Sequence, residues 1–405
     1  MRIENLRLEA LNGRHRAVAT IIWEDIGRSP YDLYFETETE FSEDLSCDPH
    51  AFLIGSAIPA MHYGERRVFI DAEICPELHN GLRTALAWLG HWFYGGKQCS
   101  LGIEAKKRSS LSSPRTPERA GFFFSGGIDS FGTLISNHQT FPARHPWYIK
   151  DGFLIFGLEQ DDAERFKYVR AALSNISREN DITLLPVYTN VYLPYREEDR
   201  SNHFAFWDHE FQAAALSSVA HAFSRRVTVV SIPASDAIPT DVFLKRKQIN
   251  PSGTHPVLDY NYSSCEVRIR HDGVTLSRFE KTQLVADQHH LLTHLRVCNQ
   301  YKRYQSNRLN CGMCEKCFRT MLTLRVIGVL DRTDAFPRVD LYETLKRQKN
   351  LNPYFYLELL GPLEKIGLHK MVKEIKKKIS LYRRQKRADK VKEKIKEYLK
   401  YRHPK

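Results

Sequence analysis

The hexapeptide SGGIDS, which begins at Ser125, is the part of the chain whose composition points most directly to chemistry. Two adjacent glycines, Gly126 and Gly127, allow a tight turn in which backbone N–H groups face an anion. Ser125 and Ser130 add hydroxyl donors, and Asp129 can cap the following helix or hold Mg²⁺. An apolar FFF run precedes the loop and a helix-like stretch follows it, whose N-terminal dipole favours a phosphate group. The sequence thus predicts a phosphate-binding loop between a strand and a helix.

No other nucleotide-binding fingerprint competes with this loop. The chain contains neither G-x-x-x-x-G-K-[ST] nor G-x-G-x-x-G, which excludes a Walker loop and a dinucleotide fingerprint. The alternative interpretation of the hexapeptide is an ordinary turn, rich in serine and glycine, that caps a helix.

Four cysteines have the spacing of a metal site. Cys298 is followed by twelve residues and then by Cys311, Cys314 and Cys317. Four thiolates can close a tetrahedral site around Zn²⁺ and leave no position for a reacting water. We therefore expect a structural zinc site, with an iron–sulfur cluster or unrelated buried thiols as alternatives. The remaining cysteines are interpreted as scattered core or surface residues: Cys47, Cys75, Cys99 and Cys265.

Apolar patterns indicate the elements that must position these side chains. In the first 105 residues, β-branched and aromatic runs predict strands at 17–23, 31–36 and 67–70, and a leucine stripe predicts a helix at 77–93. From residue 121 onward, short apolar runs alternate with helical periodicity, as at 211–223. The runs are expected to be buried parallel strands at 121–124, 153–156, 182–187 and 227–232. Alternation of this kind predicts a doubly wound parallel α/β sheet with its ligand at the carboxyl ends of the strands.

The expected organisation has four parts. They are an N-terminal α+β accessory domain (1–105), a linker (106–120), an α/β domain with the phosphate loop and the zinc site (121–330), and a helical basic tail (331–405). The linker is inferred from a polar stretch that contains two prolines.

The net charge of +12 lies in the C-terminal end. Between Lys370 and Lys405, sixteen Lys and Arg residues stand against four acidic ones, so that the rest of the chain is neutral. Such a basic field suggests an acidic partner, which is RNA, DNA or an acidic protein surface, and a solvated helix is the alternative.

Composition also limits the cellular setting. No apolar run is long enough for a membrane span, and the charged N-terminus lacks the apolar stretch of a signal peptide. We expect a cytoplasmic protein without membrane association. Eight cysteines in such a protein favour metal binding or catalysis over a disulfide framework.

The SGGIDS loop together with the cysteine cluster resembles the QueC-like family, 7-cyano-7-deazaguanine synthase and its relatives, within the PP-loop (N-type) ATP pyrophosphatases. The resemblance covers about residues 121–327. Family members carry a lysine-centred helix start, which is matched here by residues 277–281. They end with a cysteine, a loop, C-G-x-C-x-x-C and an arginine, matched by Cys298, Cys311, Gly312, Cys314, Cys317 and Arg319.

The resemblance implies a HUP-like fold and a ligase that uses ATP, Mg²⁺ and Zn²⁺. The family enzyme cleaves ATP between the α and β phosphates and adenylates the carboxylate of 7-carboxy-7-deazaguanine. Ammonia then forms an amide, which becomes a nitrile. Lys281 would stabilise charge on the transferring phosphoryl group, although a lysine on a helix surface is the alternative. The phosphates would be bound by Ser125, Gly126, Gly127, Asp129 and Ser130.

Two departures weaken the inference about the substrate. Gly157-Leu158-Glu159-Gln160 stands where the family has aromatic-Gly-Gln, and Ile238-Pro239-Thr240-Asp241 replaces its Tyr-Pro-Asp-Cys stretch. ATP use is therefore better supported than the deazaguanine substrate. By the same resemblance, the substrate loop would hold Pro233, Ser235, Asp236 and Asp241, followed by Gly253-Thr254-His255-Pro256 and Asp259. A polar cluster at a helix start holds His203, Asp208, His209 and Glu210.

Two further functions remain open. Relatives with extra domains occur in antiphage defence, where an activated deazaguanine is joined to a partner protein, and the N-terminal domain and basic tail would then be docking surfaces. A PP-loop enzyme that modifies tRNA is the third hypothesis, with the basic tail bound to phosphates. A cluster occupied by zinc would count against a thiolating tRNA enzyme, which needs free cysteines.

Overall fold

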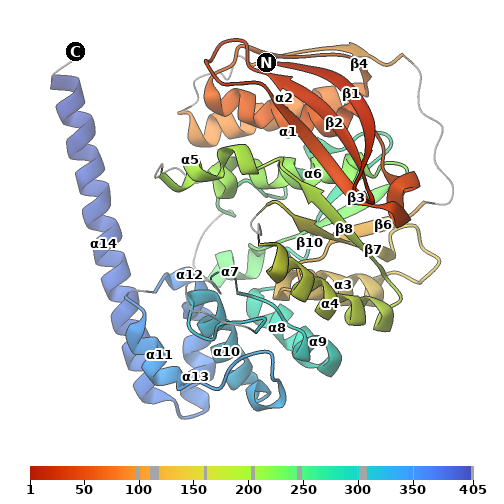
Figure 1. Cartoon of the computed structure of the whole chain (residues 1–405). Helices are drawn as coiled ribbons and strands as arrows, with labels where there is room; N and C mark the ends of the chain where they lie inside the picture. Colours follow the sequence, from red (N-terminus) through yellow and green to blue (C-terminus); the bar gives the residue numbers. More distant parts are fainter. Residues whose placement is uncertain are drawn as a thin grey trace. The chain divides into compact units, whose positions relative to one another are not determined.

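The computed structural model divides the chain by its internal contacts into two compact units (Figure 1). The first unit comprises Met1–Ala237 and Ile249–Thr275, and the second comprises Ile238–Gln248 and Leu276–Lys405. The structure describes residues 1–95, 101–109, 118–158, 162–201, 206–243, 249–298, 300, 308–349 and 351–402.

A ten-stranded sheet runs through the first unit in the order β10-β9-β6-β7-β8-β3-β2-β1-β4-β5. Its strands are β1 (Arg2–Leu11), β2 (Arg14–Ile22), β3 (Tyr31–Glu38), β4 (Arg67–Ile74), β5 (Gly102–Lys107), β6 (Ala120–Phe123), β7 (Ile149–Phe156), β8 (Thr183–Thr189), β9 (Val229–Pro233) and β10 (Arg268–Asp272). All the strands expected from the apolar runs are present, and β1, β5 and β10 are additional.

The half of the sheet from β10 to β8 is entirely parallel. Chain order there runs outward from β6 to β7 and β8 on one side, and then to β9 and β10 on the other side. This is the doubly wound order, in which the winding direction reverses between β6 and β9. The α/β core expected from the alternation of strands and helices is thereby confirmed.

The first 107 residues extend the same sheet. β3 pairs antiparallel with β8, with Phe35 opposite Thr189, and continues through β2 and β1 into the parallel strands β4 and β5. β8 is therefore not an exposed edge strand. The two compact units therefore differ from the expected domains. Residues 1–105 do not form a unit of their own, because they share a sheet and a core with the α/β segment. Most of the expected linker, residues 110–117, lies outside the described residues.

Helices cover both faces of this sheet (Figure 1). Helices α3 and α4 pack against the parallel strands on one face, and α1, α2 and α6 lie on the other. The α-helices of this unit are α1 (Pro49–Tyr63), α2 (Pro76–Phe93), α3 (Ile128–Thr140), α4 (Ala163–Glu179), α5 (Arg196–Ser201) and α6 (Gln212–Ala222). The shorter turns are η1 (Thr39–Asp44), η2 (Leu193–Tyr195), the π-helical η3 (Trp207–Phe211) and η4 (Asp259–Tyr262).

The described part of the second unit is helical. Its elements are α7 (Ile238–Phe243), α8 (Arg278–Ala286), α9 (His289–Thr293), α10 (Glu315–Ile327), η5 (Leu330–Arg332), α11 (Leu341–Arg347), α12 (Pro353–Tyr356), η6 (Leu357–Leu359), α13 (Leu360–Lys365) and α14 (His369–Arg402). Phe318 and Leu322 of α10 pack with Leu345 of α11 and Ile375 of α14 in a core of its own.

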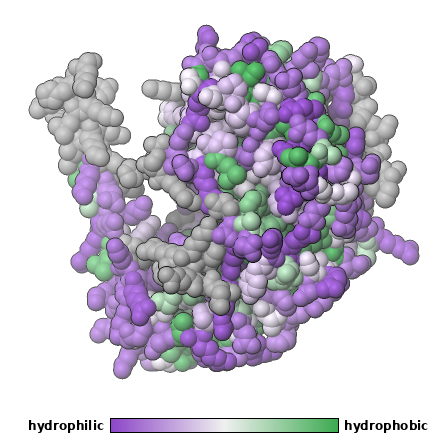
Figure 2. Space-filling model, viewed as in Figure 1, coloured by the Kyte–Doolittle hydropathy of each residue, from purple (hydrophilic) through white to green (hydrophobic). Residues whose placement is uncertain are grey.

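Helix α14 has two different halves. Its first turns bury Val372, Ile375 and Ile379, which belong to the expected apolar stripe. Residues 383–388 are exposed all around the helix, and Figure 2 shows a hydrophilic surface along this part of the chain. Among the described residues, no helix is long and apolar enough to cross a membrane.

Candidate phosphate site and metal centre

The SGGIDS loop begins where β6 ends. The N–H of Phe124 donates to the carbonyl of Phe153 on β7 at 2.8 Å, which holds the chain in the sheet up to the loop. Gly126 then takes a φ of +75°, a left-handed value that favours glycine. Gly127 is the N-cap of α3, so the strand–loop–helix order predicted from the sequence is present.

Hydrogen bonds within the loop bring its two serines together. The Gly127 N–H donates to Ser125 Oγ at 3.3 Å, and the Ser130 hydroxyl donates to the Gly127 carbonyl at 3.0 Å. Ser125 Oγ and Ser130 Oγ are 3.4 Å apart. Ser125 is exposed and Ser130 is buried, so one hydroxyl faces solvent while the other fixes the turn.

The start of α3 offers an environment for an anion and a cation together. Backbone N–H groups in the first turn of a helix lack intrahelical partners and attract negative charge. Asp129 lies in this first turn and is half-buried. A carboxylate there repels a phosphate unless a cation lies between them, so Asp129 fits a Mg²⁺ ligand better than a direct phosphate contact.

The loop also occupies a special place in the sheet. It follows β6, which lies between β7 and β9 where the winding direction reverses. In doubly wound sheets, ligands bind in the crevice outside the carboxyl ends of the strands at this reversal. Position in the sheet and local sequence therefore point to the same loop.

Lys281 belongs to the second unit, whereas the SGGIDS loop belongs to the first. It lies in α8, whose start is fixed by a capping box between Ser277 and Glu280. The Lys281 side chain is almost fully buried, which excludes the alternative of an ordinary surface lysine. Its role beside the phosphates stays a prediction.

A carboxylate–imidazole pair near the end of β10 did not stand out in the sequence. Asp259 is fully buried and lies 2.8 Å from His271 Nδ1. It also accepts hydrogen bonds from the Thr254 hydroxyl and the His255 N–H, both at 2.8 Å. The His271 side chain is 6% exposed, and its Nε2 has no hydrogen-bond partner among the described residues. A carboxylate on one imidazole nitrogen and a free second nitrogen is the arrangement of a general base.

The polar cluster at the start of α6 is part of a π-helical turn, a feature common at functional sites. Glu210 is fully buried, accepts a hydrogen bond from the Tyr94 hydroxyl at 2.6 Å and lies 2.8 Å from His62 Nδ1. His203 and Gln160, both singled out in the sequence, lie outside the described residues. A catalytic role for this cluster stays a prediction.

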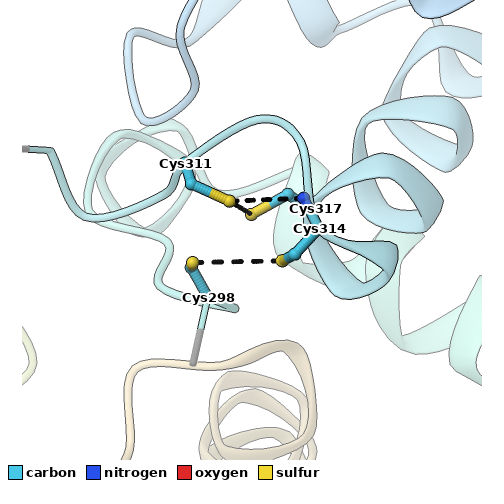
Figure 3. Close-up of side chains that lie close together, drawn as sticks. All are labelled: Cys298, Cys311, Cys314 and Cys317. Carbon is cyan, nitrogen blue, oxygen red and sulfur yellow. Dashed lines mark hydrogen bonds between the residues drawn. The ribbon is translucent and has the colours of Figure 1, made fainter. Parts of the chain in front are cut away.

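In the second unit, the four cysteines of the predicted zinc site lie together (Figure 3). All four are buried, and their sulfur atoms lie within 4.8 Å of one another. The Cys311–Cys317 and Cys314–Cys298 sulfur pairs are 3.8 and 3.9 Å apart. Four sulfurs arranged tetrahedrally about 2.3 Å from Zn²⁺ are about 3.8 Å apart. The set can therefore bind a single metal ion such as Zn²⁺, and its compactness favours one ion over a larger iron–sulfur cluster.

The backbone around Gly312 holds the sulfur of Cys311 in place. The N–H groups of Met313 and Cys314 donate to Cys311 Sγ at 3.4 and 3.3 Å. Gly312, which lies between Cys311 and Met313, has a φ of +72°, and a Cβ there would lie 2.6 Å from Pro337 Cγ. Glycine is thus required both by the backbone conformation and by the close approach of the proline ring.

The side chain of Asn310 connects the segment that carries Cys298 to the segment that carries the other three cysteines. The sequence alone did not reveal this role. Its fully buried side chain accepts hydrogen bonds from the N–H groups of Val297 and Cys298, and donates to the carbonyls of Leu295 and Ala335. One amide therefore fixes Cys298 beside the CGMCEKC segment.

The thiols influence one another strongly. Donation from the sulfhydryl groups of Cys311, Cys314 and Cys317 holds the pKa of the Cys298 thiol far below its ordinary value. The neighbouring Cys298 sulfur in turn raises the pKa of Cys317 well above its ordinary value. The pKa of Cys311 is also lowered and that of Cys314 is raised, so two of the four thiols lose their protons more readily and the other two require a cation. Arg319, which matches the arginine at the end of the family pattern, stacks 4.0 Å from the centre of the Phe355 ring and lies 3.7 Å from Glu315.

Comparison of the chain with known protein families, with curated proteins and with solved structures finds no match. The assignment of function therefore depends on the residues of the two sites and on their positions in the fold.

Proposed function

We propose that the chain is an ATP-dependent adenylating ligase of the PP-loop type, which activates a carboxylate for attack by an amine. One observation carries the proposal: the SGGIDS loop follows the central strand β6 at the reversal point of a doubly wound sheet and opens helix α3. We propose a 7-deazaguanine carboxylate as the substrate, because the loop and the cysteine cluster resemble those of 7-cyano-7-deazaguanine synthase.

The proposed reaction has two steps. A carboxylate oxygen attacks the α-phosphorus of ATP, and pyrophosphate leaves with the electrons of the broken P–O bond. The amine then attacks the acyl carbon, and AMP leaves. The N–H groups at the start of α3 and the hydroxyl of Ser125 would stabilise the charge that develops on the departing pyrophosphate. Asp129 would hold Mg²⁺ at the same phosphates.

The cysteine cluster is proposed as a structural Zn²⁺ site. Four buried sulfurs leave no open position for a substrate or water on a tetrahedral ion. The ion would fix the chain before α10, because Cys314 is the N-cap of that helix and Cys317 lies in its first turn.

The substrate is tested by incubating the protein with ATP, Mg²⁺, 7-carboxy-7-deazaguanine and ammonium, and by following products with mass spectrometry. We expect AMP, pyrophosphate and the amide or nitrile of the deazaguanine. Absence of all three products with this substrate, while other carboxylates release AMP, would refute the deazaguanine assignment and leave the ligase class standing.

A partner macromolecule is the second candidate acceptor, favoured by the exposed basic half of α14. Arg383, Arg384, Lys386 and Arg387 are exposed there. Such a surface fits a protein-modifying ligase with an acidic partner, or a tRNA-modifying enzyme. If AMP appears only when a protein fraction or tRNA is added to the reaction, one of these two functions replaces the small-molecule acceptor.

A further inference from the structure

Cys75 and Cys265, which are 190 positions apart in the sequence, meet in the first unit. Their sulfur atoms are 3.3 Å apart. Cys75 is buried and Cys265 is exposed, so one thiol is accessible and the other lies directly behind it. Cys75 is thus a core residue and Cys265 a surface residue, as expected, but the sequence did not predict that the two lie together.

Cys75 is held in a fixed position. It follows β4 directly and is the N-cap of α2, a helix of 18 residues that begins with Pro76. Its backbone N–H donates to His50 Nε2 at 2.9 Å, and His50 Nδ1 lies 2.9 Å from Asp48 Oδ1. The backbone of Cys75 is thus anchored to the start of α1.

Charged groups surround the sulfur of Cys265. Arg108 Nη2 lies 3.5 Å from Cys265 Sγ, and the Cys265 thiol donates to Glu266 Oε2 at 3.4 Å. Arg108 and Glu266 also form an ion pair with each other. The Cys265 N–H donates to Cys75 Sγ at 3.4 Å, so that backbone and side chain both connect the two cysteines. A guanidinium beside a thiol favours the thiolate, which is the reactive form.

We propose that Cys75 and Cys265 form a redox-active dithiol, which a hydroperoxide converts into a disulfide. The Cys265 thiolate attacks the outer peroxide oxygen, the O–O bond breaks, and a sulfenic acid and an alcohol (or water) are formed. The Cys75 sulfur then attacks the Cys265 sulfur, the S–O bond breaks, and the hydroxyl leaves as water with the proton of Cys75. Two thiols are oxidised and one peroxide is reduced. The sulfurs must approach by about 1.3 Å to reach a disulfide bond length.

A metal site is the competing use of the same residues, because Cys75, Cys265 and Glu266 present three possible ligands. Arg108 argues against it. Its guanidinium already pairs with Glu266 and lies beside the Cys265 sulfur, so a metal ion would place a second positive charge next to it. The environment therefore favours a pair of thiols over a metal centre.

The dithiol is separate from the phosphate loop. Cys265 precedes the amino end of β10, whereas the SGGIDS loop follows the carboxyl end of the parallel strand β6. The proposal therefore does not depend on the proposed ligase activity, and its test uses no substrate.

The test uses the reduced full-length protein, treated with hydrogen peroxide, blocked with N-ethylmaleimide and digested without reductant. We expect mass spectrometry to find a peptide pair joined through Cys75 and Cys265, which dithiothreitol separates. Cys265→Ser should remove the pair. Cys47→Ser should leave it unchanged, because the Cys47 sulfur lies half-buried against the carbonyls of Arg7 and Val18.

A second variant makes the order of the steps visible. In Cys75→Ser, we expect Cys265 to stop at the sulfenic acid, which dimedone traps. The exposed Cys265→Ser variant, checked for folding by circular dichroism, covers the case in which the buried Cys75→Ser change prevents folding. Recovery of both cysteines as maleimide adducts after peroxide treatment would overturn the proposal. So would a loss of one bound metal equivalent in Cys265→Ser, because the residues would then be metal ligands.

Discussion

At the scale of single residues, different groups of the SGGIDS loop are suited to the two functions that ATP cleavage requires, phosphate binding and cation binding. Backbone N–H groups and the exposed hydroxyl of Ser125 are suited to the phosphate oxygens, while the half-buried carboxylate of Asp129 is suited to a cation. Neutral donors alone would leave the charge of the departing pyrophosphate only partly compensated, so Asp129 matters through the Mg²⁺ it would hold.

His271 provides a test of the second step of the proposed reaction. Its Nε2 would accept the proton that the attacking amine loses, with Nδ1 oriented by Asp259. We expect His271→Gln to retain carboxylate-dependent pyrophosphate release in a single turnover and to slow amide formation on the order of 10²-fold. Equal slowing of both steps in this variant would indicate a structural role instead.

Removal of one cysteine tests the metal centre. Cys314→Ser deletes one of four ligands and should release the ion, which elemental analysis of purified protein would show as the loss of about one zinc equivalent. We also expect a lower melting temperature, because metal binding and folding are coupled at such sites. Cys47 lies in the other unit, so Cys47→Ser is the matched control. Iron and visible absorption in the wild type would establish the iron–sulfur alternative.

His221 predicts how stability changes with pH. Complete burial lowers the pKa of His221 from 6.5 to about 4, against the attraction of Asp48. The unfolded chain then binds more protons between pH 6.5 and 4, so the free energy of unfolding falls as the pH falls through this window. His50 and Glu266 act on the same imidazole, with opposite signs.

Below pH 4 the loss is complete, and protonation of His221 then lowers the free energy of unfolding by about 3 kcal/mol relative to its value above pH 6.5. Chemical denaturation at a series of pH values should show a flatter dependence for His221→Asn than for the wild type. The exposed His91→Gln serves as the control. Equal slopes for all three proteins would contradict the assignment.

At the scale of the elements, the two halves of α14 differ in what they do. Val372, Ile375 and Ile379 fill the core of the second unit, and Lys378 Nζ donates to the carbonyl of Lys346 at 3.1 Å. Beyond Ile379, residues 383–388 are exposed, and so are Leu381 and Val391. The basic tail is thus part structural helix and part accessible surface.

A truncation separates these roles. Deleting residues 383–405 removes the exposed basic part and keeps the buried stripe, so we expect an unchanged melting temperature and unchanged small-molecule turnover. Binding to a fluorescently labelled tRNA or acidic protein should weaken, with a smaller salt dependence than for the wild type. A deletion that starts at residue 370 should unfold the second unit, since it removes Ile375. Binding unaffected by the shorter deletion would show that the exposed half of α14 docks no such partner.

Sequence patterns predicted these elements well where the signal is local. The FFF run followed by SGGIDS indicated a strand, a turn and a helix within a few residues, and the C-x-x-C steps indicated sulfurs close in space. The pairing of β3 with β8 could not be predicted, because neither strand encodes its partner. The same limit applies to Cys75 and Cys265, and to the amide of Asn310 that bonds to four backbone groups.

At the scale of the whole molecule, one continuous sheet joins the N-terminal residues to the α/β core. A boundary at residue 105 followed from composition and two prolines, but the buried residues of α1, α2 and α6 belong to a single hydrophobic core. The first 107 residues are thus integral to the unit that carries the phosphate loop. The second unit adds the buried cysteine cluster and the basic helix.

The most direct test of the central claim is the identity of the nucleotide products. Phosphorus NMR of a reaction with ATP, Mg²⁺ and a carboxylate substrate should show AMP and pyrophosphate for the wild type. The exposed control Asp71→Ala should give the same products. Asp129→Ala should lose turnover by at least about 10²-fold at an unchanged melting temperature. ADP and phosphate from the wild type, or wild-type rates of AMP release from folded Asp129→Ala, would contradict the account.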